Sequence, residues 1–372
     1  MEGPLRILHV INELNSGGAE ALIMNWYRNI DHNLIQFDFL LRNNVNIYEK
    51  EISQYGGKVF VMPSYPRHYF KNYKQTYMFL KTHPEYRIIH VHGNALIYTN
   101  IFNIAKRLEI PCRIMHSHNT KARKKIYEIV HYFHKISIEK NANYFFACSR
   151  DAGNWMFPSK KFQILNNGIN LNLFQFDEKV RNDLREELNL KDKIIIGHVG
   201  RFLASKNHSF LIDVFKEYSK KNENAILMLI GDGPLENEIK RKIQRYSLED
   251  KVKFLGFRDD VYKLMNIMDI FVVLSFFEGL GIVLIEAQAE GLPCLVSNKV
   301  PNEAKKTDIL KFLSLDDSPQ KWANEIDYCL KTYKRHDMST DIQKNKYDIK
   351  DNASELQNFY LKIYNEEGGN NV

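Results

Sequence analysis

Short apolar runs alternate with longer amphipathic segments along almost the whole chain. Runs of mostly aliphatic residues, such as Ala225–Ile230 and Ile270–Leu274, are typical of strands buried on both faces of a parallel sheet. Between such runs, segments such as His208–Lys220 carry apolar residues at the three- and four-residue spacing of a helix with one buried face. Alternation of this kind predicts an α/β fold in which helices cover both faces of parallel sheets.

The predicted strands form two sets, separated by the turn-rich stretch Asn166–Asn170. The first set comprises Arg6–Ile11, Gln36–Leu41, Lys58–Met62, Arg87–Val91, Arg113–His116, Tyr144–Cys148 and Lys161–Leu165. The second set comprises Lys193–Val199, Ala225–Ile230, Lys251–Leu255, Ile270–Leu274, Pro293–Val296 and Lys311–Leu315. We therefore predict two doubly wound, Rossmann-like domains, residues 1–167 and 168–352, that face a central cleft.

Composition is that of a soluble globular protein, with 44% hydrophobic and 26% charged residues in a chain of 372. We expect no secretory signal, because the first residues lead directly into a predicted strand, and no apolar run in this sequence is long enough to cross a membrane. The scattered cysteines are interpreted as buried thiols of a reducing compartment, and we expect a cytoplasmic protein. They are Cys112, Cys148, Cys294 and Cys329.

The net charge of +7 is unevenly distributed. Residues 64–83 (SYPRHYFKNYKQTYMFLKTH) and residues 121–140 (KARKKIYEIVHYFHKISIEK) combine many basic and aromatic side chains with few acidic ones. Basic helices with aromatic partners can lie on an anionic membrane surface, but a solvated helix face has the same composition. Composition alone leaves both interpretations open.

The segment Phe277–Ala287 contains the most informative chemistry. Glu278 and Glu286 flank a turn that holds Gly279 and Gly281, directly after a predicted strand and before a predicted helix. The amides that open such a helix bind anions, and a carboxylate further along the helix suits ribose hydroxyls. The alternative is an ordinary strand–turn–helix joint with glutamates on the surface.

Other glycine turns also follow predicted strands. Gly17 and Gly18 open the helix after the first strand and can admit an anion or a sugar, while Gly231–Pro234 can equally be a plain turn. After Gly200, Arg201 and Lys206 are placed to clamp a diphosphate, although two solvated cations in a loop are the commoner outcome.

Histidines cluster at the ends of two strands in the first half of the chain. They are His90, His92, His116 and His118. No carboxylate or cysteine lies at zinc-like spacing beside them, so we expect no metal. A contact to a sugar, or a catalytic role near the reacting bond, is the preferred interpretation over a purely structural role.

Motifs in order along nearly the whole chain resemble the family-four retaining glycosyltransferases of GT-B fold, especially bacterial enzymes of capsular and extracellular polysaccharide synthesis. They are HVINELNSGGAE, HVHG, RIMHSHNT, FFACSRDAG, ILNNGIN, IGHVGRFLASKNHSFLI, LIGDGPLENEI, VKFLGFRDDV and FEGLGIVLIEAQAEGLPCLVS. The last contains the Glu-x7-Glu element of the family. Its combination with the GR…KN and GDGP segments is highly specific.

The resemblance implies a role for each matching residue on the donor side. Glu286 would hold the ribose of the nucleotide, and Glu278 would position the transferred sugar. Arg201 and Lys206 would neutralise the diphosphate as it leaves. The backbone amides around Leu280, Gly281 and Ile282 would cap the same phosphates, and Phe257 would lie beside the base.

On the acceptor side, the resemblance implies that Gly17 and Gly18 line the cleft and that a strand-end histidine contacts the reacting sugar. His118, which precedes Asn119, matches that position best, and His116 is the competing assignment. Such enzymes need no metal and no cofactor beyond the nucleotide sugar. The resemblance also implies that the last helix, about residues 353–365, packs back on the first domain. Its apolar stripe comprises Leu356, Phe359, Tyr360 and Ile363.

The implied function is transfer of a hexose or N-acetylhexosamine from a nucleotide sugar, expected to be a UDP-sugar, to a polyprenyl-diphosphate-linked saccharide. Peripheral contact with the inner face of an anionic cell membrane is expected, and nucleic-acid binding is not. A UDP-sugar epimerase of the same fold, or a non-catalytic nucleotide-sugar-binding subunit, are the alternatives. After Ser297, the segment Asn298–Glu303 departs from the glycine-rich turn of many relatives, which leaves the donor sugar open.

Overall fold

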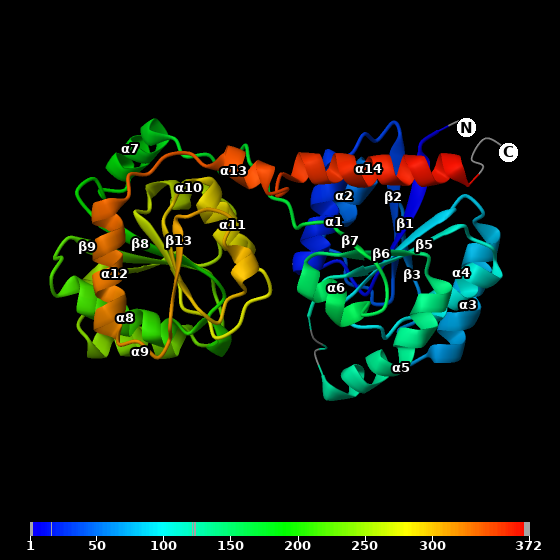
Figure 1. Cartoon of the computed structure of the whole chain (residues 1–372), viewed down its shortest axis with the longest axis horizontal. Helices are drawn as coiled ribbons and strands as arrows, with labels where there is room; N and C mark the ends of the chain where they lie inside the picture. The colour runs from blue at the N-terminus through cyan, green and yellow to red at the C-terminus, as the bar shows by residue number, and fades with distance from the viewer. Residues whose placement is uncertain (1–2, 16, 121, 123, 368–372) are drawn as a thin grey trace. The chain divides into compact units, whose positions relative to one another are not determined.

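The computed structural model describes residues 3–15, 17–120, 122 and 124–367, and the chain divides into two compact units with one parallel sheet each (Figure 1). The first unit comprises Met1–Gly168 and Ile349–Val372, and the second comprises Ile169–Asp348. The chain therefore leaves the first unit once and returns to it. The α/β fold with two doubly wound sheets, predicted from the alternation of apolar runs, is confirmed.

The sheet of the first unit has seven strands in the order β3-β2-β1-β4-β5-β6-β7. Their bounds are β1 Leu5–Ile11, β2 Ile35–Leu41, β3 Val59–Val61, β4 Ile88–Gly93, β5 Cys112–Ser117, β6 Tyr144–Ala147 and β7 Gln163–Ile164. The strand order reverses between β1 and β4, and a ligand crevice forms at the carboxyl ends of strands where such a reversal occurs.

Helices cover both faces of this sheet. One face carries α1 (Gly18–Asn29), α2 (Glu49–Gln54) and α14 (Ile349–Glu366). The other carries α3 (Tyr69–Thr82), α4 (Asn100–Arg107), α5 (Lys125–Asn141) and α6 (Arg150–Met156). Each face therefore has its own apolar core, as expected for strands that are buried on both sides.

Helix α14 lies along α1 (Figure 1). Its buried residues include Leu356, Tyr360 and Ile363 from the predicted stripe, while Phe359 is partly buried against the same core. The helix begins at Ile349, which is only 1% exposed and lies against Gly168. Burial of this first residue in the first unit explains why the helix starts before the stripe seen in the sequence.

The sheet of the second unit has six strands in the order β10-β9-β8-β11-β12-β13. Their bounds are β8 Ile194–Val199, β9 Ala225–Ile230, β10 Val252–Phe254, β11 Ile270–Val273, β12 Cys294–Ser297 and β13 Leu310–Leu313. The order reverses between β8 and β11, so the loops after these two strands open the crevice of this unit.

The helices of the second unit also lie on both faces. One face carries α8 (His208–Ser219), α9 (Glu236–Arg245) and α12 (Pro319–Thr332), and the other carries α7 (Glu178–Glu187), α10 (Val261–Ile267) and α11 (Ile282–Ala289). Helix α13 (Ser339–Lys344) lies beside α11. Short 3₁₀ turns are η1 (Ala204–Lys206), η2 (Glu249–Lys251) and η3 (Asn302–Ala304).

The cysteines correct one expectation. Of the four, only Cys112 and Cys294 are buried. Cys148 and Cys329 are partly exposed because they lie at a strand end and on the α12 surface rather than within the sheets. Among the described residues, no helix combines the length and apolarity that a membrane span requires.

Candidate active site

Three glycine turns are joined at the carboxyl edge of the second sheet. Gly200 donates its backbone N–H to the carbonyl of Ile230 over 2.9 Å, and Gly231 donates to the carbonyl of Gly256 over 2.8 Å. Gly231 and Gly233 have φ angles of 131° and 152°, which favour glycine. A Cβ on Gly233 would lie 2.7 Å from the backbone nitrogen of Phe202. The GDGP segment, for which the sequence left a plain turn open, therefore locks the loop that carries Arg201 and Lys206.

Glu278 lies in the loop between β11 and α11 and is only 9% exposed. Lys206 Nζ and Ser275 Oγ both donate to Glu278 Oε1 over 2.6 Å. The loops after β8 and β11 are also joined by a 2.8 Å bond from the Phe276 amide to the Ser205 carbonyl. The crevice between these strands thus contains an ammonium and a carboxylate in contact.

Arg201, predicted to act with Lys206, has different surroundings. Its side chain is 70% exposed, and its guanidinium lies 3.9 Å from Asp232, which is 62% exposed. An exposed ion pair of this length constrains the side chain weakly. Arg201 is therefore free to turn toward an anion, whereas Lys206 is already held in the crevice.

Helix α11 begins directly after this loop. Gly281 is its N-cap, with a left-handed φ of 74°, and within the described part of the chain no side-chain cap bond is formed at this N-cap. The amides that follow Leu280 and Gly281, including that of Ile282, therefore have no side-chain acceptor. Unpaired amides and the helix dipole make this terminus attractive to phosphate.

Glu286 lies one turn further along α11 and is partly exposed. Burial raises its pKa to about 7. Among the described residues, no hydrogen-bond donor or cation pairs with its carboxylate. A partly buried carboxylate without a partner can accept hydrogen bonds from a ligand, and vicinal hydroxyls supply two donors.

Phe257 follows Gly256, which has a left-handed φ of 65°. The ring is 79% exposed beside the GDGP turn, to which Gly256 is hydrogen-bonded. An exposed aromatic ring next to a ligand crevice offers a flat apolar face for stacking.

His198 was not singled out from the sequence. It lies at the end of β8, is 1% exposed, and its Nδ1 is 2.7 Å from the carbonyl of Val272. Burial lowers its pKa to about 4, so the ring is neutral and Nδ1–H donates to that carbonyl. Its Nε2 has no partner and lies beside Gly200 and Lys206. Its position two residues before Gly200, at the predicted end of a strand, was the available signal.

The first unit has a cavity of about 300 Å³ at the carboxyl ends of β1, β4 and β5. It is lined by Ile11, Asn12, Ala19, Glu20, Arg42, Tyr65, Pro66, Val91, His92, Gly93, Asn94, Ala95, Leu96, Ile97, Tyr98, Thr99, Met115, His118 and Tyr127. Of the two competing histidines, His118 borders the cavity and is partly exposed, whereas His116 is fully buried. The geometry therefore favours His118 for ligand contact.

Gly17 and Gly18 lie beside this cavity, and neighbouring side chains fill the space around Gly17. A Cβ on Gly17 would collide with the Glu20 carboxylate and would lie 2.9 Å from Asn15 Oδ1, so a larger residue there would displace these two side chains. Gly18 has no atom within 4 Å of its notional Cβ. Because Glu20 occupies the start of α1, this terminus suits a sugar hydroxyl better than a second anion.

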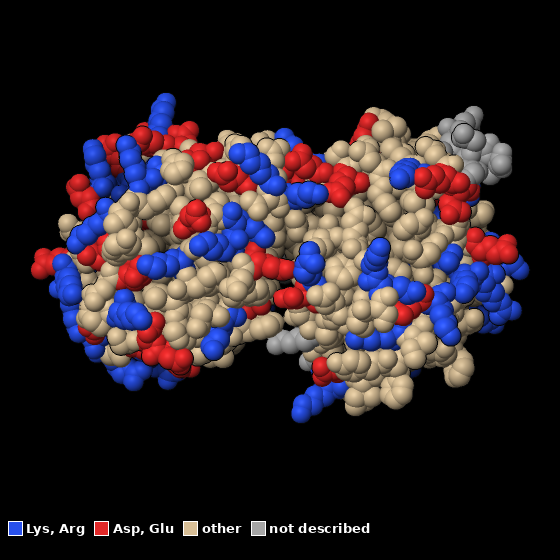
Figure 2. All heavy atoms as spheres, viewed as in Figure 1, with Lys and Arg blue, Asp and Glu red and all other residues tan. Residues whose placement is uncertain are grey.

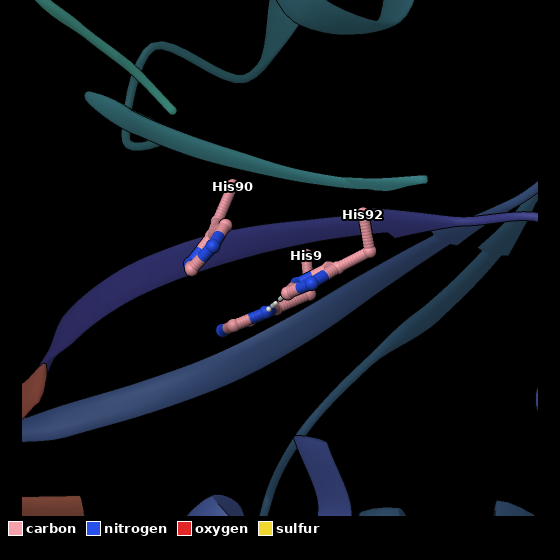
Figure 3. Close-up of side chains that lie close together, drawn as sticks. All are labelled: His9, His90 and His92. Carbon is pink, nitrogen blue, oxygen red and sulfur yellow. Dashed lines mark hydrogen bonds between the residues drawn. The ribbon is translucent and has the colours of Figure 1, made fainter. Parts of the chain in front are cut away.

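Buried histidines behind His118 form a hydrogen-bonded chain. His9 Nδ1 lies 2.9 Å from His92 Nε2, and His92 Nδ1 lies 2.9 Å from His118 Nε2. Figure 3 shows the first of these bonds between nearly parallel rings, with a 10° angle between their planes. Burial lowers the pKa of His9 and of His118 to about 3, so both rings are neutral at physiological pH.

Neutrality limits the chain to two arrangements, because each ring carries one proton. With every proton on Nδ1, His9 donates to His92, His92 donates to His118, and His118 keeps a free N–H. In the reverse arrangement, His9 keeps a free N–H on Nε2. Both end atoms, His118 Nδ1 and His9 Nε2, are buried and have no hydrogen-bond partner among the described residues, so burial does not choose between the two arrangements.

A second series of hydrogen bonds links His90, His116 and Tyr360. His90 Nδ1 lies 2.5 Å from the Tyr360 hydroxyl, and His90 Nε2 lies 3.1 Å from His116 Nδ1. Tyr360 is on α14, so these rings hold that helix to the sheet. Both rings therefore make structural contacts, and the sugar contact expected for this histidine cluster stays a prediction.

Within the described residues, two histidine trios have metal-like spacing: His9, His90 and His92, and His92, His116 and His118. Hydrogen bonds between the rings already use their facing nitrogens. Neither trio includes a carboxylate or thiolate to offset the charge of a buried dication. The geometry is therefore better suited to hydrogen bonding than to metal binding.

Comparisons with known proteins point to one family. The family model "Glycosyl transferases group 1" matches residues 180–348. EpsF of Bacillus subtilis (strain 168), whose name places it among glycosyltransferases, is 33% identical over 376 residues, covering 95% of this chain and 96% of that protein. The UDP-Gal:alpha-D-GlcNAc-diphosphoundecaprenol alpha-1,3-galactosyltransferase of Escherichia coli is 32% identical over 143 residues, 37% of each chain.

Solved structures share the fold at low sequence identity. Anabaena Alr3699/HepE in complex with UDP has a TM-score of 0.79 at 19% identity, covering 96% of this chain and 100% of that one. A glycosyltransferase from Rickettsia africae has a TM-score of 0.78 at 17% identity, covering 97% and 98%. Together with the two parallel sheets, these similarities confirm the predicted GT-B fold.

Proposed function

The chain belongs to the group 1 glycosyltransferases, and we propose that it moves a hexose or N-acetylhexosamine from a UDP-sugar to a lipid-linked saccharide in polysaccharide synthesis, with retention at the anomeric carbon. Identity to EpsF extends over nearly the full length of both chains, which makes the protein a transferase and confirms the family resemblance. The donor, the acceptor and the stereochemistry are the parts that we propose.

The observation that carries the proposal is the contact of Lys206 and Ser275 with Glu278 beside the open N-terminus of α11. Both contacts use Oε1 of Glu278, which leaves Oε2 for a hydroxyl of the donor sugar. Lys206 Nζ has three donors, so it can bind a phosphate oxygen while it remains bonded to Glu278. This supports Glu278 as a residue that positions the sugar rather than a nucleophile.

Phosphate binding follows from the same geometry. The amides of α11, Lys206 and the exposed guanidinium of Arg201 would stabilise the negative charge that grows as the diphosphate leaves. An acceptor hydroxyl would form its bond to the anomeric carbon on the face from which the diphosphate departs, and its proton would pass to a leaving phosphate oxygen. Because these groups supply positive charge themselves, we propose a reaction without a divalent ion.

Uridine binding is proposed for Glu286 and Phe257. The unpartnered carboxylate of Glu286 suits the two ribose hydroxyls, and the exposed ring of Phe257 suits the base. Solved structures of Alr3699/HepE contain UDP, UDP with glucose, and UDP-glucose, which supports a uridine donor for this fold.

The acceptor is proposed to enter the cavity of the first unit. His118 borders it, and we propose that its ring contacts the sugar near the reacting bond. Two relatives, from Escherichia coli and Campylobacter jejuni, are named for transfer to saccharides on diphosphoundecaprenol. A lipid-linked acceptor would bring the enzyme to a membrane surface.

Helix α5 supplies a surface for such contact. Ile126, Ile129, Phe133 and Ile136 are spaced three or four residues apart and are 54–79% exposed, which gives a solvent-facing apolar stripe. Lys125 and Lys140 lie at the ends of this helix and are exposed. Figure 2 shows further Lys and Arg side chains gathered over α3 and α4. Apolar insertion combined with basic charge is how peripheral helices bind anionic bilayers.

Vesicle sedimentation tests this surface. We expect the protein to pellet with vesicles containing anionic phosphatidylglycerol and to remain in solution with neutral phosphatidylcholine vesicles. Phe133→Ser with Ile136→Ser should reduce binding about tenfold or more, since each buried apolar group contributes about 1 kcal/mol or more. The matched control is Tyr328→Ser on α12, which removes an exposed aromatic ring elsewhere. Equal losses for both variants would contradict the membrane role of α5.

The function itself is tested by UDP release from UDP-glucose, UDP-galactose and their N-acetyl derivatives in the presence of a prenyl-diphosphate-linked sugar. We expect release to require the acceptor, to persist in EDTA, and to fall at least 100-fold in Lys206→Met. UDP-sugar consumption without acceptor would instead support an epimerase. Unchanged UDP affinity in Glu286→Ala would contradict the proposed donor site.

A further inference from the structure

Arg42 is a cation in the cavity of the first unit for which the described residues supply no ion-pair partner. It follows β2 directly, and its backbone amide donates to the carbonyl of Asn12 over 3.0 Å. The side chain is only partly exposed and lines the cavity together with His118. Its Nε is buried and has no hydrogen-bond partner in the part of the chain that the structure describes.

Aromatic rings hold the guanidinium in place. Its Cζ lies 4.4 Å from the ring centroid of Tyr98, at cation–π distance. Tyr98 is 5% exposed and its hydroxyl donates to Asn72 over 3.1 Å, while Tyr65 meets it edge-on at 5.0 Å. Stacking leaves the N–H groups around the guanidinium edge available for a ligand.

The charges around Arg42 favour an incoming anion. Burial lowers the pKa of Arg42, against a smaller opposing effect of Tyr98 and Tyr65, and an arginine remains charged under these conditions. Glu20 lines the same cavity, but its carboxylate lies against Gly17 at the start of α1, and Glu20 is not among the groups that raise the pKa of Arg42. A desolvated cation without a counter-ion is unfavourable, and an anionic ligand would remove that penalty.

We propose that Arg42 binds an anionic group of the acceptor, either a phosphate of its diphosphate or a carboxylate of an acidic sugar. The inference rests on the proposed function, because that function places the acceptor in this cavity. The guanidinium fork matches both phosphate and carboxylate, so the chemistry of the site is shared by the two sources. Arg42 would then select charged acceptors, in addition to any contact made by His118.

Three acceptors with the same terminal sugar distinguish a phosphate from a sugar carboxylate as the group that Arg42 binds. They are a short prenyl diphosphate, a neutral alkyl glycoside, and an alkyl glycoside with a neighbouring hexuronic acid. Arg42→Met keeps a flexible apolar stem over Tyr98 and removes the charge. We expect it to raise the acceptor KM about 10- to 100-fold for the acceptor whose anion Arg42 binds, with the KM for the UDP-sugar unchanged. Arg67→Met, at an exposed arginine outside the cavity lining, is the matched control.

A loss confined to the diphosphate acceptor identifies the diphosphate as the ligand, and a loss confined to the uronic acid identifies the sugar carboxylate. Equal losses for charged and neutral acceptors, or equal losses in Arg67→Met, would overturn the proposal.

A binding assay is independent of turnover. With saturating UDP to fill the donor site, prenyl diphosphate or an alkyl glucuronide should raise the unfolding temperature of the wild type but not of Arg42→Met. If sugar is transferred to none of the acceptors, the proposed function is refuted. The binding assay then tests by itself whether Arg42 binds an anion. No stabilisation by either anion would overturn that site.

Discussion

Glu286 and Glu290 lie one helical turn apart at α11, but among the described residues only Glu290 has a charged partner. Glu290 is fully buried, and its carboxylate accepts a 2.8 Å bond from Arg335. Glu286 is partly exposed and has no ion-pair partner among the described residues. Glu290 therefore contributes to the fold, whereas Glu286 is available to a ligand. The Glu-x7-Glu spacing identified the second carboxylate, but only its surroundings show that it is unpaired.

Glu286→Gln should alter stability in a pH-dependent way. Burial raises the pKa of Glu286 from 4.5 to about 7, so the folded state prefers the protonated carboxyl. Its stabilising contribution is complete below pH 4.5 and is lost as pH rises to about 7. We expect Glu286→Gln to unfold with a free energy about 1–3 kcal/mol higher than wild type at pH 8 and similar to wild type at pH 4.5. Denaturant titrations at both pH values measure this.

Glu290→Gln is the matched control, since it removes the partner of the buried Arg335. It should destabilise the protein at pH 8 by about 3 kcal/mol. A Glu286→Gln variant that is less stable than wild type at pH 8 would contradict the assignment of Glu286 as an unpaired carboxylate.

His92 is expected to position His118. His92→Phe removes the ring nitrogen that is hydrogen-bonded to His118, whereas His92→Asn keeps an amide group, which can donate or accept a hydrogen bond, near the Nδ1 position. We expect His92→Phe to lower kcat about 10- to 100-fold with little change in the KM for the donor, and His92→Asn to recover much of that loss. Nitrogen-15 shifts of the histidine rings report their protonation directly, and a charged His118 ring would contradict the neutral chain.

At the scale of elements, the strands were predictable because both faces of each sheet are covered. Central strands such as β9 are then apolar at every position, and its predicted bounds, Ala225–Ile230, agree with the structure. The turns at the carboxyl edge were less predictable. The GDGP turn was compatible with a plain loop because its contact with Phe202 joins segments far apart in sequence.

Gly231→Ala tests this joint between elements. Gly231 has a φ of 131°, and a Cβ there would collide with the carbonyl of Gly200. We expect a loss of about 2–4 kcal/mol in unfolding free energy and a weaker affinity for UDP, because the loop that carries Lys206 would shift. Thermal unfolding and UDP titration measure both effects.

Gly279→Ala serves as the comparison for stability. No atom lies within 4 Å of the notional Cβ of Gly279, and its φ does not require glycine. Its unfolding free energy should stay within about 0.5 kcal/mol of wild type. If Gly231→Ala and Gly279→Ala destabilise the protein by similar amounts, the loss is not specific to the contact between Gly231 and Gly200. That result would contradict the role given to this contact.

At the scale of the whole molecule, the two units differ in how the chain builds them, because one is a continuous segment and the other is not. Residues 169–348 form a continuous segment with its own cores, whereas the first unit needs α14 from the far end of the sequence. We expect residues 169–348 alone to unfold cooperatively and to bind UDP, and residues 1–168 alone to expose apolar surface and aggregate. Circular dichroism and light scattering measure these properties.

A direct fusion provides the control for the first unit. Gly168 lies against Ile349, so a short linker can join residues 1–168 to 349–367 without passing through the second unit. This fusion should be soluble and cooperative, since Tyr360 and Leu356 again cover the sheet. A soluble, cooperatively folded fragment 1–168 would contradict the role given to α14.

The sequence by itself determined the two-sheet α/β architecture, the family and the segments that carry Lys206, Glu278 and Glu286. These follow from local periodicity and from short motifs, whose spacing along the chain is independent of distant contacts. The apolar stripe of α14 likewise predicted a covering helix, although not its start at Ile349.

Only the tertiary structure decided how the candidate site residues are paired. It brought Lys206 to Glu278, left Arg201 exposed, and separated His118 at the cavity from His116 in the core. Arg42 carried no signal in the sequence, because an arginine after a strand is ordinary until its neighbours are known to be rings rather than carboxylates. Burial and pairing depend on segments that are distant along the chain, and periodicity along one segment does not contain that information.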